Sequence, residues 1–223
     1  MNYIEDMPDI STPYVYDSNT KSRLKQKSKQ SNFSHKSWDD SDIQDIKSDI
    51  RNFYRLKQNA RCAFCNQQLS LVSAFNCTIE HILPKSDYLE FIFEPKNLCV
   101  ICADCNQIKR NQEIESEFFK LLKKQNPTLY PRSSNAFLIV HPHFDCFGDH
   151  ILEINGYYLD KTLKGAHTIL VCELNRKLHR LGYENIGFSE VDLMSIIGEL
   201  MKETDLLKRS KQLEILKKML ILI

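Results

Sequence analysis

The chain has 223 residues, enough for one large domain or for a small catalytic domain with additions. Hydrophobic residues make up 42% of it and charged residues 26%, a composition that can build a core and stay soluble. Six glycines and seven prolines exclude a collagen-like or repetitive chain. The net charge of +1 also excludes nucleic-acid binding by bulk charge, so such binding would need a local basic patch or a partner.

Residues 1–40 are polar, and we expect them to form a flexible N-terminal extension. Five basic residues crowd into its second half: Lys21, Arg23, Lys25, Lys27 and Lys29. Such a run is typical of a solvated segment, and the alternative is an arm that touches nucleic acid. The first residues lack the pattern of a signal peptide, and no apolar run is long enough to span a membrane. We therefore expect a cytoplasmic protein with no membrane partner.

A helix is predicted to begin at residues 39–41, where aspartate and serine are good caps. Apolar residues then recur at helical spacing, at Ile43, Ile46, Ile50, Phe53 and Tyr54. Farther along, residues 74–82 and 97–101 are predicted strands, and residues 104–124 are a predicted helix. We expect residues 41–130 to form one core together with the leading helix.

Residues 131–223 are expected to form a C-terminal α/β region. Apolar residues 137–140 indicate a strand, the pair at 155–156 indicates a β-hairpin, and residues 165–180 indicate a helix. The last predicted helix, residues 189–220, has apolar residues along one stripe. That stripe is either part of the core or a face that docks a partner protein.

Two CxxC pairs lie in the middle of the chain, Cys62/Cys65 and Cys102/Cys105. Zinc prefers four tetrahedral ligands in structural sites, and each CxxC turn delivers two thiolates to one point. The pairs therefore predict a four-cysteine structural zinc site. A redox pair is the alternative, which the absence of a thioredoxin-like βαβ pattern weakens. The other four cysteines show no such pairing, and we expect buried thiols at Cys77, Cys99, Cys146 and Cys172.

We call the two CxxC pairs together the cysteine clamp. Polar residues between these pairs and directly after them suit phosphodiester hydrolysis. That reaction needs a water nucleophile, a base to deprotonate it and a cation to stabilise the transition state. Glu80 offers a carboxylate for a hard cation, and the neighbouring His81 offers an imidazole for the water. Asn106 offers an amide oxygen in the first turn of the next helix, and Lys109, on the same helical face, suits a phosphate. Asn97 can hold the loop that carries His81.

In this order the residues resemble the HNH nuclease family in its zinc-clamped ββα-metal form. The matching positions are Cys62-x-x-Cys65, Glu80-His81-Ile82-Leu83-Pro84, Asn97-Leu98 and Cys102-x-x-Cys105-Asn106-x-x-Lys109. The resemblance implies an α+β fold with a ββα-metal core, in a mainly helical chain with a small C-terminal β-hairpin region. It implies that Glu80 and Asn106 bind Mg²⁺ or Mn²⁺, that His81 is the general base, and that Asn97 orients the His81 loop. Glu80 departs from the aspartate that is more frequent in the family.

The segments IEHILPK and FEPKNL and the later KGAHTI are similar to HNH proteins of bacterial anti-phage operons. Operons of the Septu and retron-associated types pair such a nuclease with an ATPase. This resemblance implies an ATPase partner and a role in antiviral defence.

A second histidine cluster follows the apolar run, at His141, His143 and Asp145. If a strand continues there, the three side chains share a face and could bind a metal, as in amidohydrolase-like enzymes. The other interpretations are a polar strand end that supports the fold, and an accessory role for His141 and His143 beside the nuclease site.

The sequence thus favours a metal-dependent endonuclease that cleaves DNA and leaves 5′-phosphate ends. One alternative is an HNH nuclease that cleaves RNA, including transfer RNA, because such a site reads backbone rather than base. Another is a non-catalytic zinc module that binds nucleic acid or a partner protein.

Overall fold

The computed structural model describes most of the chain. The described residues are 10, 12–111, 120–154, 157–177, 197–198, 200, 202–205, 207–210, 212–213 and 216. The chain divides into two compact units, the first with residues 1–152 and 159–174 and the second with residues 153–158 and 175–223. Every candidate site residue named above lies in the first unit.

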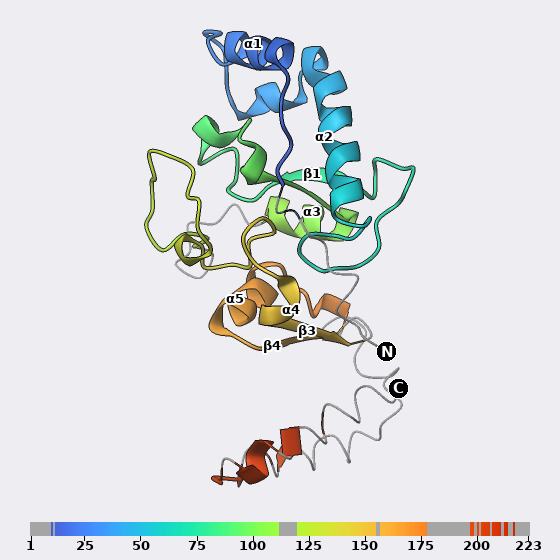
Figure 1. The fold of residues 1–223 in the computed structure, drawn as a ribbon, viewed down its shortest axis with the longest axis vertical. Coiled ribbons are helices and arrows are strands. Elements are labelled where there is room, and N and C mark those ends of the chain that lie inside the picture. The colour runs from blue at the N-terminus through green and yellow to red at the C-terminus, as the bar shows by residue number, and fades with distance from the viewer. Residues whose placement is uncertain are drawn as a thin grey trace. The chain divides into compact units, whose positions relative to one another are not determined.

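Helices and short strands both occur, so the predicted α+β class is confirmed (Figure 1). The helices are α1 (Ser18–Lys27), α2 (Gln44–Lys57), α3 (Ala103–Asn111), α4 (Phe147–His150) and α5 (Leu163–Val171), with short 3-10 turns between several of them. The strands are β1 (Thr78–His81), β2 (Leu98–Ile101), β3 (Ile151–Ile154) and β4 (Tyr157–Asp160). They form two two-stranded sheets, β1 with β2 and β3 with β4.

The strands β1 and β2 run antiparallel, and α3 follows β2 after one residue. Glu80 pairs with Cys99 across the ladder, and His81 pairs with Leu98. Helix α2 packs on both strands and buries its apolar face there, as its helical spacing of isoleucines predicted. The fully buried Gln58, at the end of α2, bonds both backbone groups of Val100, at 2.7 and 2.8 Å. This amide satisfies the Val100 N–H, and the Val100 carbonyl oxygen also accepts from the N–H of Ala63 at 3.1 Å.

The N-terminal extension contains a helix where a flexible segment was expected. Asp17 caps α1 by accepting a hydrogen bond from the backbone N–H of Thr20 at 2.7 Å. Two members of the basic run face acidic residues in the first turn of α2 and in the segment before it. Arg23 pairs with Asp45, and the buried Lys27 pairs with Asp40 and Asp42. The helix was not expected because the basic run was counted without its acidic partners, which lie 13 to 22 residues farther along.

Other departures concern the ends of elements. Residues 137–140 form no strand but a single bridge from Phe137 to Leu122, because the backbone already bends at residues 138 and 139. Residues 120–122 are not helical, so the predicted helix at 104–124 corresponds to α3 alone among the described residues. Helix α5 covers only the first part of predicted helix 165–180. The predicted helix at 189–220 falls largely outside the described residues.

Aromatic and aliphatic side chains form a core beside the sheet of β1 and β2. This cluster contains Leu83, Tyr88, Phe91, Leu122, Tyr130 and Phe137. Its first three members follow His81 in sequence, so burial of this cluster fixes the loop that leaves β1.

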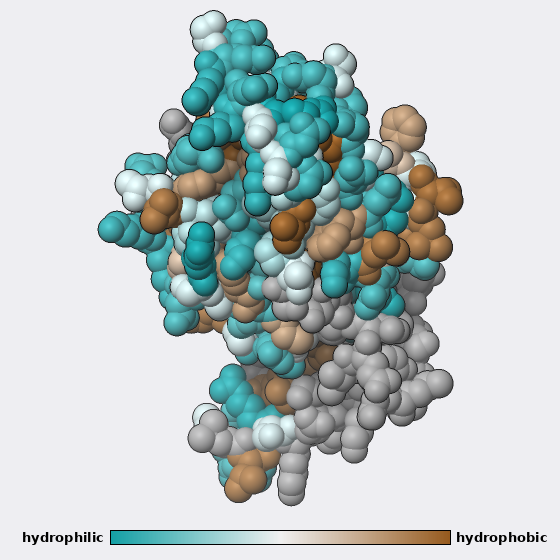
Figure 2. Space-filling model, turned by 45° about the horizontal axis from the view of Figure 1, so that its top comes forward, coloured by the Kyte–Doolittle hydropathy of each residue, from teal (hydrophilic) through white to brown (hydrophobic). Residues whose placement is uncertain are grey.

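The face in Figure 2 is mainly hydrophilic, with apolar residues at one edge. The most exposed large apolar side chains before β1 are Val72 and Phe75.

Candidate metal centre and active site

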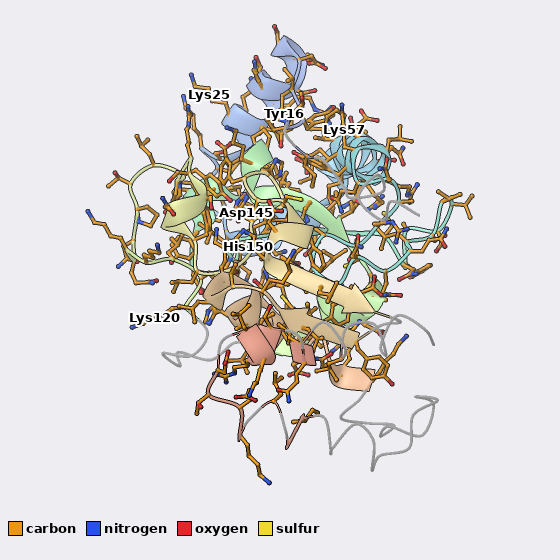
Figure 3. All side chains as sticks on the ribbon, turned by 60° about the horizontal axis from the view of Figure 1, so that its bottom comes forward. Tyr16, Lys25, Lys57, Lys120, Asp145 and His150 are labelled. Carbon is orange, nitrogen blue, oxygen red and sulfur yellow. The ribbon has the colours of Figure 1, made fainter. Side chains whose placement is uncertain are left out.

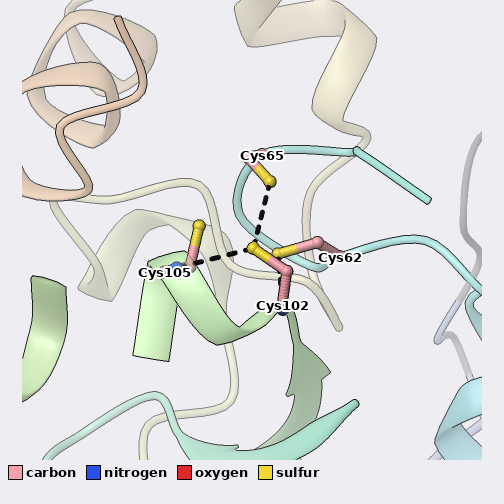
Figure 4. Close-up of side chains that lie close together, drawn as sticks. All are labelled: Cys62, Cys65, Cys102 and Cys105. Carbon is pink, nitrogen blue, oxygen red and sulfur yellow. Dashed lines mark hydrogen bonds between the residues drawn. The ribbon is translucent and has the colours of Figure 1, made fainter. Parts of the chain in front are cut away.

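The four cysteines of the predicted clamp come together in the structure (Figure 4). Their sulfur atoms are buried and lie within 4.8 Å of one another, and Cys65 Sγ is 3.7 Å from Cys102 Sγ. A tetrahedral site with Zn–S bonds of about 2.3 Å would place its sulfur atoms about 3.8 Å apart. The donor set and its spacing therefore fit a structural zinc ion.

Backbone N–H groups point at the sulfurs of this cluster. The N–H of Cys102 donates to Cys62 Sγ, and the N–H of Cys105 donates to Cys102 Sγ, each at 3.4 Å. Hydrogen bonds from Cys105 and the other thiols lower the pKa of Cys102 below its ordinary value, which favours a thiolate. Because Cys102 and Cys105 bracket the start of α3, a metal bound here would fix that helix relative to the loop that carries Cys62 and Cys65.

Lys109 and Glu80 form an ion pair between α3 and β1. Lys109 Nζ lies 2.8 Å from Glu80 Oε1, and the two side chains are 8% and 15% exposed. Lys109 Nζ also donates to the carbonyl oxygens of His81 and Ile82, each at 3.2 Å. Burial alone would lower the pKa of Lys109, but the Glu80 carboxylate raises it above its ordinary value, so Lys109 carries its charge. These are different partners from the phosphate expected for Lys109.

Glu80 keeps one carboxylate oxygen open. Its Oε2 has no hydrogen-bond partner among the described residues and is not one of the fully enclosed polar atoms. Lys109 therefore fixes the carboxylate through one oxygen and leaves the other accessible.

His81 is held at one ring nitrogen and open at the other. Its Nε2 lies 3.0 Å from the carbonyl oxygen of Ile92, so Nε2 carries the proton of this hydrogen bond. Within the described part of the chain Nδ1 has no hydrogen-bond partner, and it is not fully enclosed although the residue is only 5% exposed. Burial lowers the pKa of His81 to about 3, with smaller contributions from Lys85 and Lys109. The imidazole is therefore neutral at neutral pH, with its lone pair on Nδ1.

Asn97 is fully buried between β1 and the loop that follows it. Its Oδ1 accepts a hydrogen bond from the N–H of Leu83 at 2.7 Å. Its Nδ2 donates to the carbonyl oxygens of Leu83 and Phe91, each at 3.1 Å. Its own carbonyl oxygen accepts from the N–H of Ile82 at 2.8 Å. Asn97 thus bonds the chain on both sides of the segment that ends at Ile92, the residue whose carbonyl oxygen holds His81.

Asn106 lies in the first turn of α3, one residue after the last clamp cysteine. It is partly exposed, and its side-chain amide has no hydrogen-bond partner among the described residues. Lys109 follows one turn later on the same face of α3 and contacts Glu80. The amide of Asn106 is therefore free to bind a ligand on the side of α3 that faces β1.

The second histidine cluster is tied into the fold by hydrogen bonds, with only His143 Nδ1 buried without a partner among its described ring nitrogens. His141 is fully buried; its Nε2 lies 2.8 Å from the Tyr130 hydroxyl, and its Nδ1 accepts from the N–H of His143. Burial lowers the pKa of His141 well below its ordinary value, and both ring nitrogens have protein partners. Asp145 pairs with Lys164 at 2.7 Å and lies beside His150 (Figure 3). Among the described residues only the four cysteines bring metal-ligand atoms together, so this cluster does not form the metal site of the amidohydrolase-like interpretation.

Sequence reasoning missed two groups that hold His81. One is the carbonyl oxygen of Ile92, which no side-chain pattern could reveal. The other is Trp38, whose ring packs against the imidazole with 4.5 Å between the ring centroids. Trp38 is the single tryptophan of the chain, and that rarity was the one available signal.

These observations describe an α+β protein with a four-cysteine cluster that fits structural zinc, with the Glu80–Lys109 ion pair between β1 and α3, and with the His81 imidazole bonded to Ile92. Neither a protein-family model nor a solved structure matches the chain. Over 150 residues it is 27% identical to the Septu protein PtuB of Bacillus thuringiensis, a match that covers 66% of this chain. The matched region spans 50% of that relative. In the described residues no helix is long and apolar enough to cross a membrane.

Proposed function

We propose that the chain is a metal-dependent HNH-type endonuclease that hydrolyses phosphodiester bonds, with DNA as the favoured substrate. The observation that carries this proposal is the state of His81. Its Nε2 is tied to a backbone carbonyl, its Nδ1 is open, and it follows a carboxylate with one accessible oxygen. In the core, His141 has a protein partner at both ring nitrogens, whereas His143 is bonded at Nε2 and its unbonded Nδ1 is fully enclosed. His81 differs from both, because its unbonded nitrogen is not fully enclosed.

The residues available for a catalytic cation supply oxygen ligands. Glu80 Oε2 and the amide oxygen of Asn106 are accessible, and hard cations such as Mg²⁺ and Mn²⁺ prefer carboxylate and amide oxygens. When bound, such a cation would stabilise the negative charge that develops on the phosphate and on the departing oxygen. Lys109 acts here by holding the Glu80 carboxylate in one orientation rather than by binding the phosphate itself.

In the proposed reaction His81 Nδ1 accepts a proton from the attacking water. The water oxygen attacks phosphorus in line with the departing 3′ oxygen, which takes up a proton as it leaves. The products are a 5′-phosphate and a 3′-hydroxyl. The Ile92 carbonyl oxygen stabilises the imidazolium that forms, because it accepts the hydrogen bond from Nε2. Asn97 keeps that carbonyl in place through its bonds to Leu83 and Phe91.

A role in bacterial anti-phage defence is part of the proposal. It rests on the distant similarity to the Septu protein PtuB and on the resemblance of the His81 segment to nucleases of such operons. The near-neutral charge of the chain favours delivery to nucleic acid by a partner, for which an ATPase is the proposed candidate. Tight, salt-sensitive DNA binding by the isolated chain would count against that dependence.

The test is a cleavage assay with the full chain, with and without its ATPase partner, on DNA and RNA panels under Mg²⁺, Mn²⁺ or EDTA. We expect cation-dependent cleavage that falls by about a hundredfold or more in His81→Ala. Cleavage of RNA alone would establish the RNA-cleaving alternative. A His81→Ala protein that cuts as well as wild type would show that the mechanism is wrong.

A second candidate function is a non-catalytic zinc module that binds nucleic acid or a partner protein. The ion pair between Lys109 and Glu80 favours it, because a carboxylate neutralised in this way can be purely structural. This candidate predicts bound zinc, no cation-dependent cleavage, and unchanged ligand binding in Glu80→Gln. The cleavage assay above separates the two functions.

A further inference from the structure

The N-terminal segment contributes one aromatic side chain, Trp38, to the candidate site. Trp38 lies in the short 3-10 helix His35–Asp39 and is 5% exposed. Its ring meets that of His81 edge to face, with a centroid distance of 4.5 Å and an interplanar angle of 77°. Aromatic rings in this arrangement attract each other by about 0.5–1.5 kcal/mol beyond the area that they bury. The contact joins residues 43 positions apart in sequence.

Trp38 is itself held firmly. Lys47 Nζ, from α2, donates to the Trp38 carbonyl oxygen at 2.9 Å and lies 5.3 Å from the centre of its ring. Phe93 flanks the ring on another side, with 6.1 Å between the centroids. The preceding turn is closed by a capping box at Ser34 and Ser37. The tryptophan therefore has one preferred position, set by contacts that do not involve His81.

The neighbouring Asp39 ties this segment to the loop after His81. Its two carboxylate oxygens accept from Lys47 of α2 and from Lys85, each at 3.2 Å. Burial would raise the pKa of Asp39, but the two lysines lower it below its ordinary value, so the carboxylate stays charged. Asp39 thereby connects the 3-10 helix that carries Trp38 to α2 and to the loop after His81. This connection lies on the side of His81 where Trp38 packs.

Two contacts thus define the orientation of the His81 ring. The hydrogen bond to Ile92 fixes Nε2 but leaves the ring plane free to tilt about that bond. Trp38 restricts this tilt, because its ring occupies the adjacent space. A general base needs its lone pair aimed at the water, and small displacements of a reacting group reduce rates strongly.

We propose that Trp38 is a positioning residue for His81, so that the N-terminal segment completes the site that β1, β2 and α3 begin. This inference rests on the proposed function. Trp38 touches no reacting atom; it restricts the imidazole to the orientation in which Nε2 bonds Ile92 and Nδ1 is not fully enclosed. The site then requires the 3-10 helix His35–Asp39 in addition to the motif between Cys62 and Lys109.

The test compares Trp38→Ala and Trp38→Phe with wild type and with Phe33→Ala in the full chain. Phe33 belongs to the same segment and packs on Phe93, at 5.9 Å between ring centroids, without contacting His81. We expect Trp38→Ala to lower kcat about tenfold or more with KM changed less than threefold, and Trp38→Phe to recover most of the loss. Phe33→Ala is expected to keep the wild-type kcat.

A second measurement does not depend on cleavage. The ring-proton resonances of His81, assigned by their loss in His81→Ala, are displaced in wild type by the ring current of Trp38. They should move toward free-imidazole values in Trp38→Ala and stay displaced in Phe33→Ala. Unchanged kcat together with unchanged His81 resonances in Trp38→Ala overturns the inference while the proposed function stands. Absence of any His81-dependent cleavage by wild type overturns the proposed function and this inference with it.

Discussion

Lys109 Nζ and Glu80 Oε1 lie 2.8 Å apart, in a pair that joins the first helix after the cysteine clamp to the strand that carries His81. A lysine in this position serves two needs at once. It neutralises a nearly enclosed carboxylate, and it bonds two backbone carbonyls where β1 ends. The pair therefore couples the cysteine cluster, through α3, to the orientation of Glu80.

Substitution of Lys109 by methionine should destabilise the protein by about 3 kcal/mol, because removal of one partner leaves the other charge buried without compensation. Urea denaturation measures this loss. The double variant Glu80→Gln/Lys109→Met should recover part of it, since no uncompensated charge remains. Lys25→Met, at an exposed position of α1, is the matched control and should change stability by less than about 0.5 kcal/mol. Equal effects at the two lysines would contradict the role of the pair.

Much of the clamp and of the strand order could be predicted from the sequence. The spacing within each CxxC pair is local, so the sequence alone determines that two thiols meet at one point, and the observed cluster bears this out. The strands β1 and β2 also fall within the predicted ranges. β2 is short because a 3-10 helix, Pro95–Asn97, ends directly before it and α3 begins one residue after it, and apolar patterns do not define such ends.

The partners of the charged residues could not be predicted. The sequence position of Lys109 predicts the side of α3 on which it lies but not the group that it contacts. A phosphate and a carboxylate were therefore equally compatible with the sequence as partners of Lys109. In the same way, the partners of Arg23 and Lys27 lie on a segment that only the fold brings near. Pairing across such distances depends on tertiary packing, and the same holds for the contact of Trp38 with His81.

The purified protein should contain one zinc ion per chain, and Cys105→Ser should lose both the zinc and the fold. Structural zinc contributes about 10–16 kcal/mol of apparent binding free energy in small zinc domains, as much as or more than the whole stability of a typical domain. Elemental analysis and circular dichroism measure the two losses. Cys146→Ser is the control, because Cys146 lies outside the cluster and is exposed rather than buried as the sequence led us to expect, whereas Cys77, Cys99 and Cys172 are buried. Zinc retained at full occupancy in Cys105→Ser would contradict a four-cysteine site.

Asp145 should make stability depend on pH in the acid range. Burial would raise the pKa of Asp145, but hydrogen bonds from the His141 N–H and from Lys164 leave it below its ordinary value. Its contribution is therefore fully present above the unfolded pKa of about 3.9 and is lost as the pH falls through the lower folded pKa. Asp145→Asn should flatten the decline of unfolding free energy below pH 4. The exposed Asp160→Asn should leave that decline unchanged, and a decline equally steep in both variants would refute the prediction.

Gly165 should tolerate no side chain, because a Cβ atom there would lie 2.0 Å from the carbonyl oxygen of His150. This close approach lets α5 begin against α4, where Thr162 caps the helix by accepting from the N–H of Gly165 at 3.1 Å. Gly165→Ala must push two backbone segments apart, which should cost about 1–3 kcal/mol or more in thermal or urea unfolding. Gly198→Ala is the matched control, because a Cβ atom there meets nothing within 4 Å. That substitution should be neutral or stabilise the chain by up to about 1 kcal/mol, so a comparable loss at both glycines would show that the contact with His150 is not the cause.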